Sequence, residues 1–88
     1  MQLYEQTVVR VQEIIGDMSP AKPETAGPEL ILIDDLGYDS IHFLELALAL
    51  EAEFNLFEFD EEQAVGMITV GDVAHLIAKI VVAAEDPT

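Results

Sequence analysis

The sequence contains no cysteine, so neither a disulfide framework nor a thiolate metal site can form. No apolar run approaches the roughly 20 residues that a membrane-spanning helix needs. The first residues, 1–5, lack the basic region of a signal peptide. The missing cysteine alone leaves the compartment open, and a cytoplasmic protein is the simpler expectation.

Basic residues are almost as scarce. Arg10, Lys22 and Lys79 stand against 18 acidic residues, which gives a formal net charge of −15. Such a surface repels nucleic-acid phosphates and anionic lipids, so we expect neither nucleic acid nor membrane as a partner. It attracts proteins with basic patches and raises their association rates. The simpler alternative is that the charge only keeps a small monomer soluble.

The chain does contain enough apolar patterning for one small domain. Hydrophobic residues make up 51% of its 88 positions, and acidic residues interrupt well-patterned apolar runs. We therefore expect a single domain over 1–88 with an all-α fold. The pattern predicts a long loop over 16–39, a short third helix over 60–65, and three main helices over 3–15, 40–54 and 70–83.

The first expected helix follows an apolar stripe at helical spacing: Tyr4, Val8, Val11 and Ile15, widened by Leu3 and Ile14. Gly16 is expected to end it, because glycine adopts left-handed backbone angles at little cost. Arg10 is expected on the solvated face, near Glu13. Prolines and glycine then forbid a regular helix, and we interpret the apolar residues 30–33 as loop packed onto the helices.

The helix over 40–54 is expected to begin at Asp39 or Ser40, because both residue types cap helices well. It has two apolar stripes. One is suited to the core and contains Phe43, Leu46, Ala47, Leu50 and Phe54. The second lies on an adjacent face, beside Glu45, and contains Ile41, Leu44 and Leu48. Either this helix is nearly central in the bundle, or the second stripe is a docking surface.

The two later helices also have start signals. Asp60 and Gln63 resemble the start of the short helix, which Gly66 is expected to close. Thr69 and Asp72 form a clearer capping box before the last helix. The tail from Glu85 onward is expected to fray.

Ser40 lacks the surroundings of a catalytic nucleophile. A nucleophile elbow has the pattern G-x-S-x-G, but His42 stands where the second glycine belongs. On a helix His42 also points away from Ser40, so it is a poor base for it. The acidic residues from Asp34 to Asp39 do not match a calcium loop, because Leu36 and Tyr38 occupy ligand positions. We predict neither a catalytic residue nor a metal site.

The position of Ser40 favours a phosphate ester instead. A phosphate at a helix N-terminus meets free backbone N–H groups and the positive end of the helix dipole. Gly37 allows the backbone of another protein to approach the turn closely. The alternative is that Ser40 is only an N-cap, and patterning does not decide between the two.

Residues 35–41, Asp-Leu-Gly-Tyr-Asp-Ser-Ile, resemble the D-L-G-x-D-S-[LI] signature of acyl carrier proteins, whose serine carries 4'-phosphopantetheine. The likeness continues through Glu45-Leu46 and 49–54, and Asp60-Glu61-Glu62 and Thr69-Val70 fall at the family's usual distances. It implies a four-helix acyl-carrier-like bundle that is not an enzyme. The cofactor would be attached to Ser40, beside Asp39 and Gly37. Its thiol would hold acyl, aminoacyl or polyketide intermediates as thioesters, which suits a chain without cysteine.

The same resemblance implies partners. A phosphopantetheinyl transferase would modify Ser40 from coenzyme A. Loading enzymes for acyl or aminoacyl groups, ketosynthases, acyltransferases and condensation-type enzymes would then act on the cargo. The family's contacts with its enzymes fall on six residues here: Asp39, Ile41, Leu44, Glu45, Leu48 and Glu51.

Some residues depart from the fatty-acid carriers. His42 and Ala52 stand where those carriers often have acidic residues, and Phe59 replaces a common proline. The segments 38–41 and 71–73 look more like free-standing carriers of polyketide or mixed nonribosomal peptide pathways. We therefore expect a carrier of secondary-metabolite biosynthesis, with a fatty-acid carrier or a peptidyl or aminoacyl carrier as alternatives. An acidic helical adaptor that is never modified is the alternative of another class.

Overall fold

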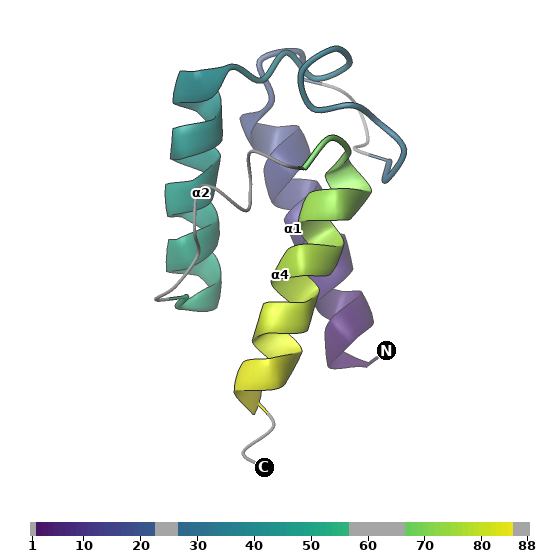
Figure 1. Ribbon diagram of the computed structural model, residues 1–88, viewed down its shortest axis with the longest axis vertical. Coiled ribbons are helices and arrows are strands. Elements are labelled where there is room, and N and C mark those ends of the chain that lie inside the picture. Colours follow the sequence, from purple (N-terminus) through teal and green to yellow (C-terminus); the bar gives the residue numbers. More distant parts are fainter. Residues whose placement is uncertain (1, 23–26, 57–66, 86–88) are drawn as a thin grey trace.

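The computed structural model describes residues 2–22, 27–56 and 67–85, and within them the regular structure is entirely helical (Figure 1). Helix α4 packs closely along α1, and α2 lies against α1. The helices are α1 (Leu3–Met18), α2 (Ser40–Phe54) and α4 (Val70–Glu85). The all-α prediction is thereby confirmed. The predicted short helix over 60–65 and the start and stop signals around it lie outside the described residues.

Both ends of α2 fall where the sequence predicts them, because each end has a strong local signal. The Asp39 carboxylate accepts a hydrogen bond from the His42 backbone N–H at 2.9 Å, so Asp39, not Ser40, is the N-cap. At the other end Asn55 adopts left-handed backbone angles (φ 55°, ψ 48°), which asparagine tolerates better than most residues. Its N–H donates to the Glu51 carbonyl.

The predicted end of α1 is wrong. Gly16 stays within the helix, which runs to Met18, and among the described glycines only Gly37 has a positive φ. The stop comes from Pro20, because a proline disfavours helical angles in the residue before it. Ser19 accordingly takes extended angles (φ −65°, ψ 133°). Helix α4 also runs past its predicted end at residue 83, to Glu85, and residues 86–88 lie outside the described part.

The core lies where α1 and α4 meet the segment 30–38 and the inner stripe of α2. The inner stripe is the first of the two predicted stripes: Phe43, Leu46, Ala47, Leu50 and Phe54. Most of the predicted α1 stripe faces it, but Leu3 is 41% exposed at the open end of the helix. In α2, Phe43 and Phe54 are only partly buried. Burying a large aliphatic side chain contributes about 1.5–3 kcal/mol each. The fully buried large side chains include Val11, Ile15, Leu32, Leu36, Leu50, Val70 and Ile77.

The segment 30–33 is loop, as predicted, and one isolated bridge between Ile31 and Thr69 ties it to the start of α4. Leu32 N–H donates to the Ile68 carbonyl at 3.0 Å. Leu32 is fully buried, whereas Ile33 is 62% exposed, so the expected packing of this loop onto the helices is wrong for Ile33. The chain turns over residues 32–36, where Asp35 N–H donates to the Ile31 carbonyl at 2.8 Å, and the turn directs these two neighbouring side chains differently.

Polar contacts complete the scaffold. The predicted capping box is confirmed: Asp72 N–H donates to the Thr69 hydroxyl at 3.1 Å, and Thr69 N–H donates to the Asp72 carboxylate at 3.0 Å. Arg10 pairs with Glu13 at 3.2 Å, as predicted, and also with Glu53 of α2 at 2.6 Å. None of the described helices is long and apolar enough to cross a membrane.

Candidate functional site

Ser40 is the first residue of α2 and is exposed. The sequence has one other serine, Ser19, which is 0% exposed. The Ser19 hydroxyl donates a 2.7 Å hydrogen bond to the Leu36 carbonyl. Ser40 is therefore the only serine whose hydroxyl another molecule can reach.

In the part of the chain that the structure describes, neither histidine is hydrogen-bonded to Ser40. His42 Nδ1 lies 2.7 Å from Asp39 Oδ1, and His75 Nδ1 lies 2.6 Å from the Tyr4 hydroxyl. The hydrogen bond from the His42 backbone N–H lowers the pKa of the Asp39 carboxyl, and the imidazole adds to this effect. Asp39 therefore stays negatively charged next to Ser40.

The turn before Ser40 alternates between inward and outward side chains. Leu36 and Tyr38 are buried, and Gly37 and Asp39 are exposed between and after them. Gly37 has a φ of 78°, which glycine adopts without strain. This alternation turns Asp39 outward, and Ser40, at which α2 begins, is exposed as well.

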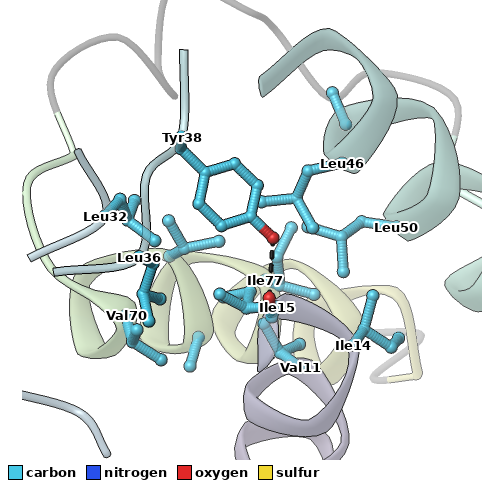
Figure 2. Close-up of a cluster of buried hydrophobic side chains, with 13 residues drawn as sticks. Val11, Ile14, Ile15, Leu32, Leu36, Tyr38, Leu46, Leu50, Val70 and Ile77 are labelled. Carbon is cyan, nitrogen blue, oxygen red and sulfur yellow. Dashed lines mark hydrogen bonds between the residues drawn. The ribbon is translucent and has the colours of Figure 1, made fainter. Parts of the chain in front are cut away.

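Tyr38 is the anchor of this turn. Its hydroxyl donates a 2.7 Å hydrogen bond to the Ile15 carbonyl (Figure 2). Its ring stacks on Phe43 with centroids 5.4 Å apart. Burial raises the pKa of the Tyr38 phenol. The sequence pattern does not predict the structural roles of Tyr38 and Ser19. The period-two pattern of Leu36 and Tyr38 is the signal that identifies the inward side of the turn.

The second predicted stripe of α2, which we call the outer stripe, is exposed over its whole length. Ile41 is 67% exposed, Leu44 46% and Leu48 58%. The interpretation of α2 as a nearly central helix is therefore wrong. Asp39 and Glu45 are exposed beside the stripe, Glu51 is half-buried, and α2 contains no lysine or arginine.

These features define a class of protein: a small helical domain that presents an accessible serine hydroxyl at the start of an acidic and apolar helix, with no catalytic group bonded to it among the described residues. Comparison with known families gives the same result, because the family described as "Phosphopantetheine attachment site" matches residues 9–77.

Curated relatives agree with this family. The chain is 37% identical over 67 residues to the acyl carrier protein of Wolinella succinogenes, which covers 76% of this chain and 87% of the relative. It is 40% identical over 70 residues to the acyl carrier proteins of Clostridium perfringens (80% of this chain, 91% of the relative) and Bdellovibrio bacteriovorus (80% and 88%). The chain belongs to the acyl carrier protein family. Its members are carriers, not enzymes, and bear 4'-phosphopantetheine covalently on a serine.

The residues present fit this group. Ser40 is exposed and stands at the positive end of the α2 dipole, which favours a phosphodiester there. The bound group supplies a terminal thiol that forms thioesters with the cargo. The fold holds Ser40 outward, next to the exposed stripe of α2.

Proposed function

We propose that Ser40 is the attachment residue for 4'-phosphopantetheine and that the protein carries acyl or polyketide intermediates in secondary-metabolite biosynthesis. The observation that carries the attachment site is the contrast between the two serines. Ser40 is exposed at the start of α2, whereas Ser19 is buried and its hydroxyl is bonded to the Leu36 carbonyl.

The attachment step needs a phosphopantetheinyl transferase and coenzyme A. Ser40 Oγ forms a bond to the phosphorus that bears pantetheine, and the pyrophosphate bond of coenzyme A breaks. Adenosine 3',5'-bisphosphate leaves, and the serine proton passes to a base of the transferase. Asp39, which caps the helix, and Gly37, which lets the transferase backbone approach, complete the acceptor site.

We propose the acidic and apolar face of α2 as the docking surface for enzymes. Its exposed stripe buries apolar area on contact, and its carboxylates attract a basic rim. Transferase, loading enzymes, ketosynthases, acyltransferases and condensation-type enzymes would share this one surface. The docking residues are Asp39, Ile41, Leu44, Glu45, Leu48 and Glu51.

The pathway is inferred from motif details. The segments 38–41 and 71–73 resemble carriers of polyketide or mixed nonribosomal peptide pathways, and His42 departs from fatty-acid carriers. A fatty-acid carrier and a peptidyl or aminoacyl carrier are the alternatives. We propose that the protein is cytoplasmic, which is the simpler expectation for a chain without cysteine. We also propose that it is a monomer, because its net charge of −15 makes copies repel one another.

Intact mass after incubation with a promiscuous phosphopantetheinyl transferase and coenzyme A tests the attachment site. We expect the wild type and Ser19→Ala to gain one phosphopantetheinyl group, and Ser40→Ala to gain none. No gain in the wild type, or a gain that survives in Ser40→Ala, contradicts the proposal. Identification of the thioesters on the protein from its native source then decides between polyketide, fatty-acid and aminoacyl cargo.

The docking surface is tested by charge changes on α2. Leu44→Glu and Glu45→Lys should raise the KM of the transferase for the carrier, while helix content measured by circular dichroism stays unchanged. Val9→Glu is the matched control, because Val9 is exposed to a similar extent (42%) on α1. Equal KM values for all three variants and the wild type would place docking elsewhere.

A further inference from the structure

Two buried hydrogen bonds join the end of α1 to the turn that precedes Ser40. The Ser19 hydroxyl donates to the Leu36 carbonyl, and the Tyr38 hydroxyl donates to the Ile15 carbonyl, each at 2.7 Å. Ser19 and Tyr38 are 0% and 2% exposed. Each segment thus provides one hydroxyl and one carbonyl, and we name this reciprocal pair the hydroxyl clasp.

The clasp satisfies backbone groups that have few other partners. The last carbonyls of a helix have no partner within the helix. Ser19 N–H donates to the Gly16 carbonyl, so the buried Ile15 carbonyl relies on Tyr38. The Leu36 carbonyl is buried in the turn and accepts from Ser19 and, at 3.3 Å, from Ala21 N–H. Opening the clasp therefore takes the Tyr38 donor from the buried Ile15 carbonyl and leaves the Leu36 carbonyl with only the longer bond from Ala21, which is costly.

Tyr38 also connects the clasp to α2. Its hydroxyl reaches the Ile15 carbonyl of α1 (Figure 2). Its ring stacks on Phe43, one turn into α2. Asp39 is the single residue between this anchored tyrosine and Ser40, and it is extended (φ −124°, ψ −175°) before the helix begins. The direction of Ser40 is thus set from one side by Tyr38 and from the other by the first turn of α2.

We propose that Tyr38 and Ser19 are positioning residues for phosphopantetheinylation: the hydroxyl clasp holds Ser40 in the orientation in which a transferase accepts it. This inference rests on the proposed attachment at Ser40. Neither residue touches the reacting atoms, and both act through the turn. A reacting group held in one productive geometry reacts faster than one that samples several.

The inference separates positioning from docking. The docking residues of α2 lie outside the clasp, so a carrier with an open clasp still binds the transferase. Its Ser40 is then productively oriented in a smaller fraction of complexes. Loss of the clasp should therefore lower kcat and leave KM nearly unchanged, whereas loss of a docking contact raises KM. A role in stability alone changes neither constant while the protein stays folded.

The experiment measures kcat and KM of transfer from coenzyme A to the wild type, Tyr38→Phe, Ser19→Ala and the double variant. Tyr4→Phe is the matched control, because it removes the other tyrosine hydroxyl, which lies near the N-terminal end of α1 and makes an exposed hydrogen bond with His75 of α4, away from the clasp. Assays are run at a temperature at which circular dichroism shows every variant folded, and the single variants serve if the double variant is unfolded.

We expect kcat to fall by about threefold or more in the double variant, by less in each single variant, and KM to stay within about twofold of the Tyr4→Phe value. A smaller fall in kcat, or an effect confined to KM, overturns the inference. The endpoint mass of the wild type tests attachment separately, so failure of the clasp does not resemble failure of the proposed function.

Discussion

Replacing Tyr38 by phenylalanine removes one oxygen atom from the core and leaves the ring and its packing in place. The lost atom is the donor to the Ile15 carbonyl at 2.7 Å. Ile15 is 0% exposed, so water does not replace the donor without a rearrangement. The variant therefore isolates the cost of leaving one buried carbonyl unpaired.

That cost is about 1–3 kcal/mol for a buried polar group that loses its partner. In a domain of 60–100 residues, 1 kcal/mol shifts Tm by about 4–8 °C. Taking the middle of the first range, about 2 kcal/mol, we expect Tm to fall by about 8–16 °C. The matched change Tyr4→Phe should cost less than about 1 kcal/mol, because its hydrogen bond to His75 is exposed.

The wild type and Tyr38→Phe should also differ in how the free energy of unfolding depends on pH at alkaline pH. Burial raises the pKa of Tyr38 above its ordinary value of 10.0. Below pH 10 the phenol keeps its proton in both the folded and the unfolded state, so the contribution of Tyr38 to the free energy of unfolding is fully present. As the pH rises further, the unfolded state loses the proton first. The free energy of unfolding then falls by about 1.4 kcal/mol per pH unit until the native pKa is reached. The Tyr38→Phe variant lacks this slope.

Thermal and urea unfolding followed by circular dichroism, at pH 7 and in steps from pH 9 upward, measure both effects. The difference in stability between wild type and Tyr38→Phe should shrink above pH 10. A Tm within about 2 °C of the wild type at pH 7, or equal losses in the Tyr38 and Tyr4 variants, would refute the assignment of a structural hydrogen bond to Tyr38.

Three further predictions concern other parts of the scaffold. Hydrogen bonds from the Thr69 backbone and its neighbour lower the pKa of Asp72, so this carboxylate stabilises the fold above pH ~4 and stops doing so as the pH falls below 3.8 through its native pKa. Melting curves from pH 5 to 2 should show that the deficit of Asp72→Asn against the wild type disappears on acidification. Leu50→Ala should cost about 2–5 kcal/mol in urea unfolding, because Leu50 is 0% exposed; a cost below about 1 kcal/mol would contradict its place in the core. Arg10→Gln should leave the midpoint of urea unfolding almost unchanged, since its side chain is 46% exposed and exposed ion pairs contribute little, and a clear loss of stability that persists in high salt would contradict this.

The sequence predicts α2 well because its signals are local. Asp39 caps one end, Asn55 adopts the left-handed conformation at the other, and no glycine or proline interrupts the helix. The outer stripe of Ile41, Leu44 and Leu48 was also visible as a second apolar face. Its exposure needed the structure, because a wide apolar arc is equally typical of a central helix.

Two features are not predicted correctly from the sequence: the end of α1, where two stop signals compete, and the turn before Ser40, which depends on tertiary contacts. Gly16 allows a helix to end but does not require it, whereas Pro20 forces Ser19 out of the helical region. Ser19 and Tyr38 bond across 17 and 23 residues of sequence, to the Leu36 and Ile15 carbonyls. Periodicity contains no information about such pairs. The sequence therefore singles out Ser40 but does not predict the anchored turn beside it.

The absence of lysine and arginine from α2 has a consequence for crowded carriers. Of the three cations elsewhere in the chain, Arg10 is already paired with Glu13 and Glu53. Two copies whose α2 faces meet have no opposite charges to exchange there, and their repulsion acts over about one Debye length, ~8 Å at physiological ionic strength. The charge of α2 therefore disfavours pairing of two copies through this face, so the face stays free for other molecules even at high concentrations of the protein.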